Sequence, residues 1–224
     1  MKKRLLAFMV LLTVLCMTFP AFADGTTGEI TGSCGKNLTY EYDPSLKTLT
    51  ISGTGKMADY SLSAGEEHVP WDSLKNGIET VNIESGVTSI GSCAFYACSN
   101  LKSIELPDSV TGIGEKAFES TAYYEDDSKW ENGVLYIGNH LIKAENDELK
   151  QAGISNYTVK SGTKTIADSA FSSCSVTSIT VPDSVTSIGR FAFYFCNELV
   201  NITLPDSVTS IGDKAFYATY LYNK

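Results

Sequence analysis

The sequence "PDSVTSIG" at residues 182–189 recurs unchanged at residues 205–212, and the near copy "PDSVTGIG" occupies residues 107–114. When the chain is aligned on the Ile-Gly pair of these copies, Ile90 and Ile113 lie 23 residues apart, as do Ile188 and Ile211. A fixed period of this length is typical of solenoid proteins, in which each repeat forms one turn. The copies therefore predict a repeated structural unit rather than three separate chemical sites.

Each repeat contains the same apolar positions. An Ile and a Phe five residues later occur five times, with Gly after the Ile in four repeats and Ala167 in the other. They are Ile90, Ile113, Ile166, Ile188, Ile211 and Phe95, Phe118, Phe171, Phe193, Phe216. One repeat cannot bury its own apolar side, but stacked repeats can, because equivalent residues form columns. The sequence therefore predicts about five turns, mainly β, with short parallel strands and a short helical turn at each Ala-Phe pair.

The repeats resemble a known family. The pattern L-x-x-I-x-L-P-x-S-V-T-x-I-G-x-x-A-F-x-x-C is best seen in "CNELVNITLPDSVTSIGDKAF" at residues 196–216. It is similar to the BspA-like class of leucine-rich repeats, and the similarity covers about residue 81 to residue 224. The resemblance implies a leucine-rich-repeat solenoid in a secreted or surface-exposed bacterial protein that contacts other proteins or host surfaces. It implies no catalytic residues.

Residues 1–23 have the pattern of a secretory signal peptide: a basic start, an apolar run from Leu5 to Phe19, and Ala21-Phe22-Ala23 as a cleavage signature. We therefore expect a secreted chain with no membrane span after cleavage. Removing three basic residues with the leader leaves 14 basic and 26 acidic residues, a net charge of −12. Such an acidic surface repels phosphate groups, so we expect no nucleic acid partner.

Two segments depart from the repeat. Residues 24–77 contain alternating apolar residues on both sides of a turn, which predicts a β-hairpin capping the repeats of residues 78–224. An insertion at about residues 119–155 contains a second hairpin signal, in which Gly138-Asn139 separates two apolar runs. Four aromatic residues gather near it, and they favour either a ligand-stacking platform or a local core: Tyr123, Tyr124, Trp130 and Tyr136.

Residues for catalysis are scarce. His68 and His140 are the only histidines, and a nucleophile–histidine set needs one of them together with an orienting group. We therefore expect no enzyme activity, and no cofactor or metal. Five cysteines follow the leader, and we expect Cys98, Cys174 and Cys196 to be buried thiols. The sequence leaves open whether Cys34 and Cys93 form a disulfide.

The outward side chains of the parallel strands are the candidate binding site. Side chains alternate along a strand, so the residues beside each buried apolar position must face outward, on an expected concave face. These residues are Thr80, Asn82, Ser103, Glu105, Asn156, Thr158, Ser178, Thr180, Asn201 and Thr203. They predict a secreted module for binding or adhesion to an extracellular protein or glycan. The alternative is a structural spacer or accessory domain of a larger extracellular, glycan-active protein.

Overall fold

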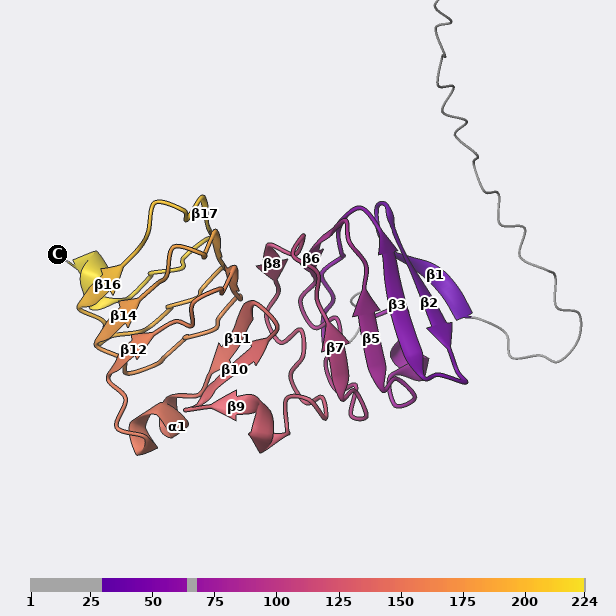
Figure 1. Cartoon of the computed structure of the whole chain (residues 1–224), viewed down its shortest axis with the longest axis horizontal. Coiled ribbons are helices and arrows are strands. Elements are labelled where there is room, and N and C mark those ends of the chain that lie inside the picture. Colours follow the sequence, from indigo (N-terminus) through magenta and orange to yellow (C-terminus); the bar gives the residue numbers. More distant parts are fainter. Residues whose placement is uncertain (1–29, 64–67, 224) are drawn as a thin grey trace, which may run out of the picture.

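The computed structural model describes residues 30–63 and 68–223, so the predicted leader at residues 1–23 lies outside the described residues. The chain forms an elongated array of short strands that begins at an antiparallel hairpin and proceeds turn by turn to residue 223 (Figure 1). Successive turns of residues 80–113 and 156–211 pair through parallel strands. The predicted solenoid is therefore confirmed.

The N-terminal half contains two sheets. The first has the order β1-β2-β3-β5-β7, with bounds Ile30–Gly35, Leu38–Asp43, Thr48–Gly53, Thr80–Ile83 and Ser103–Glu105. The second has the order β4-β6-β8, with bounds Gly55–Lys56, Val87–Ile90 and Gly112–Ile113. Strands β1, β2 and β3 pair antiparallel, whereas β3 pairs parallel to β5. The N-terminal segment is therefore a hairpin whose last strand already belongs to the repeating array.

The C-terminal half also contains two sheets. One has the order β12-β14-β16, with bounds Asn156–Thr158, Ser178–Thr180 and Asn201–Thr203. The other has the order β17-β15-β13-β11-β10-β9, with bounds Ser210–Ile211, Ser187–Ile188, Thr165–Ile166, His140–Ala144, Val134–Ile137 and Trp130–Glu131. The α-helix α1 spans Asn146–Gln151, and 3-10 turns span Asp72–Leu74, Asp127–Lys129 and Tyr220–Asn223.

The predicted columns form the core. The rings of Phe95 and Phe118 stack 5.4 Å apart, and those of Phe171 and Phe193 stack 5.5 Å apart. Ile90, Ile113, Ile166 and Ile188 are at most 2% exposed, whereas Ile211 is 51% exposed. Ile211 lies in the last described turn, where no further turn covers it. Burial of each column residue therefore depends on the next turn, as stacking requires.

Trp71 extends the aromatic column into the segment before the first repeat. Its ring stacks on Phe95 at 5.5 Å, and its indole Nε1–H donates a hydrogen bond to the Ala94 carbonyl oxygen. Trp71 is fully buried. The segment expected to lack the repeat therefore supplies a side chain to the repeat core.

The corner after each column Ile is a run of tight hydrogen-bonded turns, which takes the place of the expected short helical turn. Residues three and seven positions after the column Ile adopt positive φ in all five turns: Cys93, Ala97, Lys116, Ser120, Ser169, Ser173, Phe191, Phe195, Lys214 and Ala218. Backbone N–H groups between them bond to the next turn, as from Phe171 to the Ala192 oxygen at 2.7 Å. These bonds alternate with bonds inside the turn, such as that from the Ala170 N–H to the Ala167 oxygen, so no continuous helical ladder forms.

The glycine of the Ile-Gly pair is required by this close stacking. A Cβ atom on Gly189 would lie 2.5 Å from the Asp168 nitrogen, and one on Gly212 would lie 2.4 Å from the Arg190 nitrogen. Real Cβ atoms do not approach backbone this closely, so only glycine fits. The serine of the repeated Pro-Asp-Ser turn also joins neighbouring turns. Ser207 Oγ donates a hydrogen bond to the Val185 carbonyl oxygen of the preceding turn at 2.8 Å.

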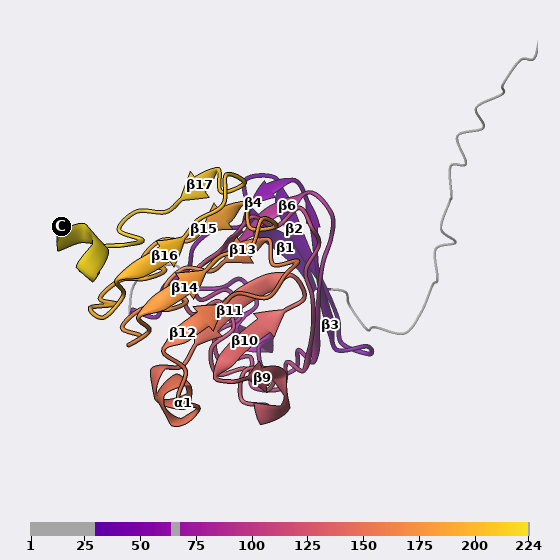
Figure 2. The same cartoon turned by 60° about the vertical axis from the view of Figure 1, so that its left-hand side comes forward.

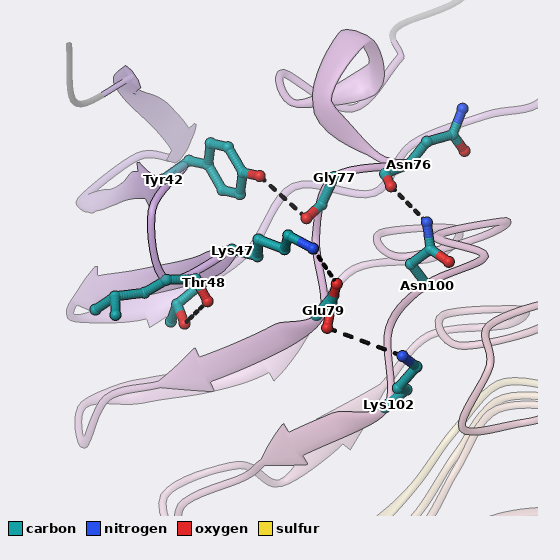
Figure 3. A network of polar contacts seen from close by, with 9 residues as sticks. Tyr42, Lys47, Thr48, Asn76, Gly77, Glu79, Asn100 and Lys102 are labelled. Carbon is teal, nitrogen blue, oxygen red and sulfur yellow. Dashed lines mark hydrogen bonds and ion pairs between the residues drawn. The ribbon is translucent and has the colours of Figure 1, made fainter. Parts of the chain in front are cut away.

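Polar contacts attach the N-terminal hairpin to the first turn (Figure 3). The Tyr42 hydroxyl donates to the Gly77 carbonyl oxygen at 3.0 Å, and Lys47 pairs with Glu79. Glu79 also lies 3.9 Å from Lys102 in the following turn. These contacts join the cap, the first strand and the second strand across successive turns.

The predicted hairpin in the insertion is confirmed, and it becomes part of the array. Strands β10 and β11 pair antiparallel with Ile137 opposite His140, and β11 then pairs parallel to β13 with Leu141 beside Ile166. Leu141 therefore takes a position in the isoleucine column. The insertion supplies a further turn, so the array has about six turns instead of about five.

Candidate binding surface

The outward residues of the C-terminal strands form two straight rows. In the parallel pairing of β12, β14 and β16, Asn156, Ser178 and Asn201 are neighbours, and Thr158, Thr180 and Thr203 are neighbours. Between the rows, Tyr157, Ile179 and Ile202 point inward and pack on the core. All six row residues are exposed except Ser178, which is half-buried. The predicted alternation thus places six small polar side chains on one face.

The N-terminal strands carry the other predicted residues. Thr80 lies beside Ser103, and Asn82 lies beside Glu105, on strands β5 and β7. Strand β3 adds Thr48 and Thr50 to the same rows, because they pair with Thr80 and Asn82. Sequence reasoning assigned β3 only to the cap, although its alternation of Thr with Leu49 and Ile51 was a usable signal.

The ten predicted residues lie on two separate sheets and do not form one continuous row. Strands β7 and β12 belong to separate sheets, and the insertion lies between them (Figure 1). Tyr136 of β10 bridges the gap, because its carbonyl oxygen accepts a bond from the Tyr123 hydroxyl at 3.1 Å. Its own hydroxyl lies 3.0 Å from the Tyr157 hydroxyl. The insertion therefore divides the surface into an N-terminal and a C-terminal face.

The aromatic residues of the insertion pack locally. The rings of Tyr124 and Trp130 meet edge to face at 5.0 Å, and the Trp130 indole N–H donates to the Tyr124 carbonyl oxygen at 2.7 Å. The Tyr124 hydroxyl donates to Glu145 at 2.9 Å, and burial with this acceptor raises the Tyr124 pKa. These contacts favour the local-core interpretation over the ligand-stacking one.

A groove of about 440 Å³ crosses the other side of the solenoid. Hydroxyls of the repeated "VTSIG" segments line it, including Thr111, Thr186 and Thr209. Burial raises the pKa of Asp168, which also lines the groove and accepts the Arg190 backbone N–H at 2.6 Å. Ser, Thr, Asp and Arg line this groove, but the described part of the chain brings no histidine or cysteine into it.

The two histidines lie in different environments. His68 is exposed, whereas His140 is 1% exposed on β11, and its Nδ1 has no hydrogen-bond partner among the described residues. Burial lowers the pKa of His140 to about 4, so the imidazole is neutral near pH 7. Within residues 30–63 and 68–223, no group of three or more His, Cys, Asp or Glu residues could hold a metal ion.

The five described cysteines are free thiols. Cys98, Cys174 and Cys196 are buried, and burial raises their pKa values to about 12, about 12 and about 11. Equivalent positions in other turns hold Thr121 and Thr219, which are also fully buried. This column therefore selects a small side chain that bonds to a nearby carbonyl, as Thr219 does to Phe216 at 2.9 Å.

Across the described ranges, no helix has the length and apolar character needed to span a bilayer.

Several solved structures are similar to this chain. A leucine-rich repeat protein from Eubacterium ventriosum is 23% identical, with a TM-score of 0.39, and the match covers 83% of this chain and 68% of that one. A leucine-rich cell surface protein from Faecalibacterium prausnitzii is 24% identical, with a TM-score of 0.30, covering 88% and 53% of the two chains. The pneumococcal vaccine antigen PcpA is 12% identical, with a TM-score of 0.33, covering 83% and 78%. No curated protein matches the sequence.

The sequence profile of the BspA-type leucine-rich repeat region matches this chain in six copies, over residues 74–154 and 142–223. These residues include every parallel turn from β5 to β17 and the insertion strand that completes the array. The count of six agrees with the further turn that β11 contributes. The chain therefore belongs to the BspA-type leucine-rich repeat family.

Proposed function

We propose that this protein is an extracellular binding module that uses the C-terminal strand face to contact another protein. The observation that carries the proposal is the pair of exposed polar rows on β12, β14 and β16. Secretion is supported by the leader pattern of residues 1–23, and the family resemblance supports contact with proteins or host surfaces. Catalysis is not part of the proposed function.

The chemistry of this face suits a polypeptide partner. Its side chains are the amides of Asn156 and Asn201 and the hydroxyls of Ser and Thr, which donate and accept hydrogen bonds without carrying charge. Desolvating neutral groups costs less than desolvating charges. The aromatic side chain of these strands, Tyr157, points inward, so the face offers no ring on which a sugar could stack within the described strands.

The rigidity of the strands supports the same function. Each row residue sits on a strand that is bonded on at least one side and packed beneath by Ile179 or its equivalents. A preorganised face loses little conformational entropy on binding, so weak polar contacts can yield measurable affinity. Repeat proteins commonly use extended surfaces of this kind for partners.

The test is capture of a partner by the chain that begins at Asp24, followed by amide hydrogen exchange of the complex. Immobilised protein is exposed to extracellular matrix proteins and, separately, to mucus glycans. We expect a captured protein, and slower exchange at residues 156–158, 178–180 and 201–203 in its presence. Slowing confined to other segments would reject this face. The spacer alternative predicts no captured partner at all.

A further inference from the structure

Four aromatic residues on the corners of the last two turns form a cluster of rings. Figure 2 shows the backbone of these turns at the orange-to-yellow end of the chain. Phe191, Tyr194 and Phe195 follow β15, and Tyr217 follows β17. The Tyr194 ring lies 5.3 Å from Phe191, 4.5 Å from Phe195 and 5.5 Å from Tyr217. We call these four residues the Phe195 cluster.

The Phe195 cluster does not belong to the solenoid core. The core ring of this turn is Phe193, which is fully buried, whereas Phe195 is 43% and Tyr217 is 45% exposed. Phe191 and Phe195 both adopt φ of 55°, a conformation that is unfavourable for bulky residues. Other turns hold Cys, Ala, Lys or Ser at these two positions. Core packing therefore gives no reason for two phenylalanines here.

Two cations flank the cluster. Arg190 and Lys214 lie over the Phe191 ring, 5.5 Å and 5.8 Å from its centroid, and both side chains are exposed. Neither takes part in any of the five ion pairs among the described residues. Arg190 is the single arginine after the leader, in a protein of net charge −9. Asp168 accepts the Arg190 backbone N–H and interacts electrostatically with Arg190, but the two cations flank the same ring and can together contact an anionic group of a ligand.

The other side of Phe195 borders a small polar hollow of about 230 Å³. Ser173, Ser175, Asn197 and Glu198 line it and bring hydroxyl, amide and carboxylate groups beside the ring. A ring next to several uncharged and charged hydrogen-bonding groups matches the surface of a sugar, which has an apolar face and a rim of hydroxyls. The lining of the hollow therefore favours a sugar over a purely acidic peptide as the ligand.

We propose that the Phe195 cluster binds an acidic glycan. A sugar ring packs on Phe195 and Tyr217, its hydroxyls bond to the lining of the hollow, and a carboxylate or sulfate group on the chain pairs with Arg190 and Lys214. Arginine suits this role because its planar fork can bond both oxygens of a carboxylate. This site lies on the corners, apart from the strand face, and does not rest on the proposed function of that face.

The test compares an acidic sugar with its neutral ester, with a second acidic sugar and with an acidic peptide. Binding of the chain from Asp24 is measured by titration with oligogalacturonate, with its neutral methyl ester, and with a chondroitin sulfate oligosaccharide. A poly-glutamate peptide is the fourth probe. We expect binding of at least one acidic sugar, loss of most of it in the neutral ester, and weakening by added salt. The proposal is overturned if no acidic sugar binds, if the ester binds equally, or if poly-glutamate binds as tightly as the sugars.

Equivalent positions in other turns supply matched controls. Arg190→Gln with Lys214→Gln should weaken acidic-sugar binding roughly tenfold or more, the usual size of a lost charged hydrogen bond. Phe195→Ala should weaken it as well. Lys116→Gln, at the position of Lys214 in another turn, and Tyr96→Ala, at the position of Tyr194 and Tyr217, should leave it unchanged. All five side chains are outside the buried core, so the variants should fold. Equal losses in the controls and in the cluster variants would refute the site.

Discussion

The rings of Phe171 and Phe193 lie one turn apart and nearly parallel, with centroids 5.5 Å apart and planes inclined by 18°. Phe193 stacks in turn on Phe216 at 5.2 Å. Phe193 therefore contacts the column rings of both neighbouring turns. Loss of its ring would remove packing from three turns at once.

Truncating a column ring should destabilise the fold strongly. We expect Phe193→Ala to lower the free energy of unfolding by about 3–5 kcal/mol, the usual cost of removing a buried phenyl group. Phe195→Ala, two residues away on the surface, should cost less than about 1 kcal/mol. Urea unfolding curves of both variants provide the measurement. Equal losses in the two variants would mean that the column has been misassigned.

Replacing a repeat glycine by alanine should destabilise the fold only where the neighbouring turn lies close to its α-carbon. A Cβ on Gly189 would lie 2.5 Å from the Asp168 nitrogen, whereas one on Gly112 would meet nothing nearer than the Ser89 Cβ at 3.5 Å. Gly189→Ala should therefore destabilise by about 1–3 kcal/mol, as overpacking does. Gly112→Ala should be nearly neutral. If thermal unfolding shows the reverse order, the stacking geometry is wrong.

His140 should make the protein sensitive to acid. Because burial lowers its pKa to about 4 from the usual 6.5, the unfolded chain binds the proton more tightly than the folded chain does. Its stabilising contribution is fully present above pH 6.5 and is lost as the pH falls toward 4, by at most roughly 3 kcal/mol. Asp108 raises the pKa of His140 and Lys164 lowers it, and both effects are smaller than that of burial.

The measurement for His140 is urea unfolding at pH 7 and pH 4.5 for the parent chain and for His140→Gln. Other groups titrate in both proteins, so the difference between the two pH dependences isolates the imidazole. We expect the parent to lose more stability on acidification than the variant does. Parallel pH profiles would show that His140 is not buried in the neutral form.

The cysteines should differ in reactivity. Alkylation requires the thiolate, and burial raises the pKa values of Cys98 and Cys174 to about 12. Cys93 is only half-buried and should react first in the native protein at pH 8. Mass spectrometry after native alkylation without reductant gives the order. A disulfide-linked peptide containing Cys174 and Cys196 would be inconsistent with the free thiols of the structure.

The repeating turns could be predicted because each must contact an almost identical neighbour. That constraint produces a regular period in the sequence. The period identifies Ile90, Ile113 and their equivalents as positions of one buried column. The corner conformation was missed for a physical reason: its positive φ angles fall on Lys116, Ser169 and Phe191, which carry no glycine-like signal. Backbone hydrogen bonds to the neighbouring turn hold these residues at positive φ. The residues on either side in the sequence give no sign of such long-range bonds.

The insertion shows a second limit. Its hairpin was predictable from Gly138-Asn139, but the parallel pairing of β11 with β13 depends on tertiary contacts across the turn. That pairing decides whether the outward residues form one strip or two faces. The Phe195 cluster was likewise invisible to pattern analysis, because Tyr194 and Tyr217 share a face only after the turns stack.

If the C-terminal strand face binds the partner, a double variant of that face should lose affinity for it. Thr180→Lys with Thr203→Lys adds two long charged side chains to adjacent strands of that face. Thr111→Lys with Thr209→Lys adds the same groups to the opposite side of the solenoid, where both residues are exposed. Both double variants should unfold within about 1 kcal/mol of the parent. We expect the first pair to abolish binding of the captured protein and the second to leave it unchanged. Full affinity in the folded Thr180 and Thr203 variant would show that the partner binds elsewhere.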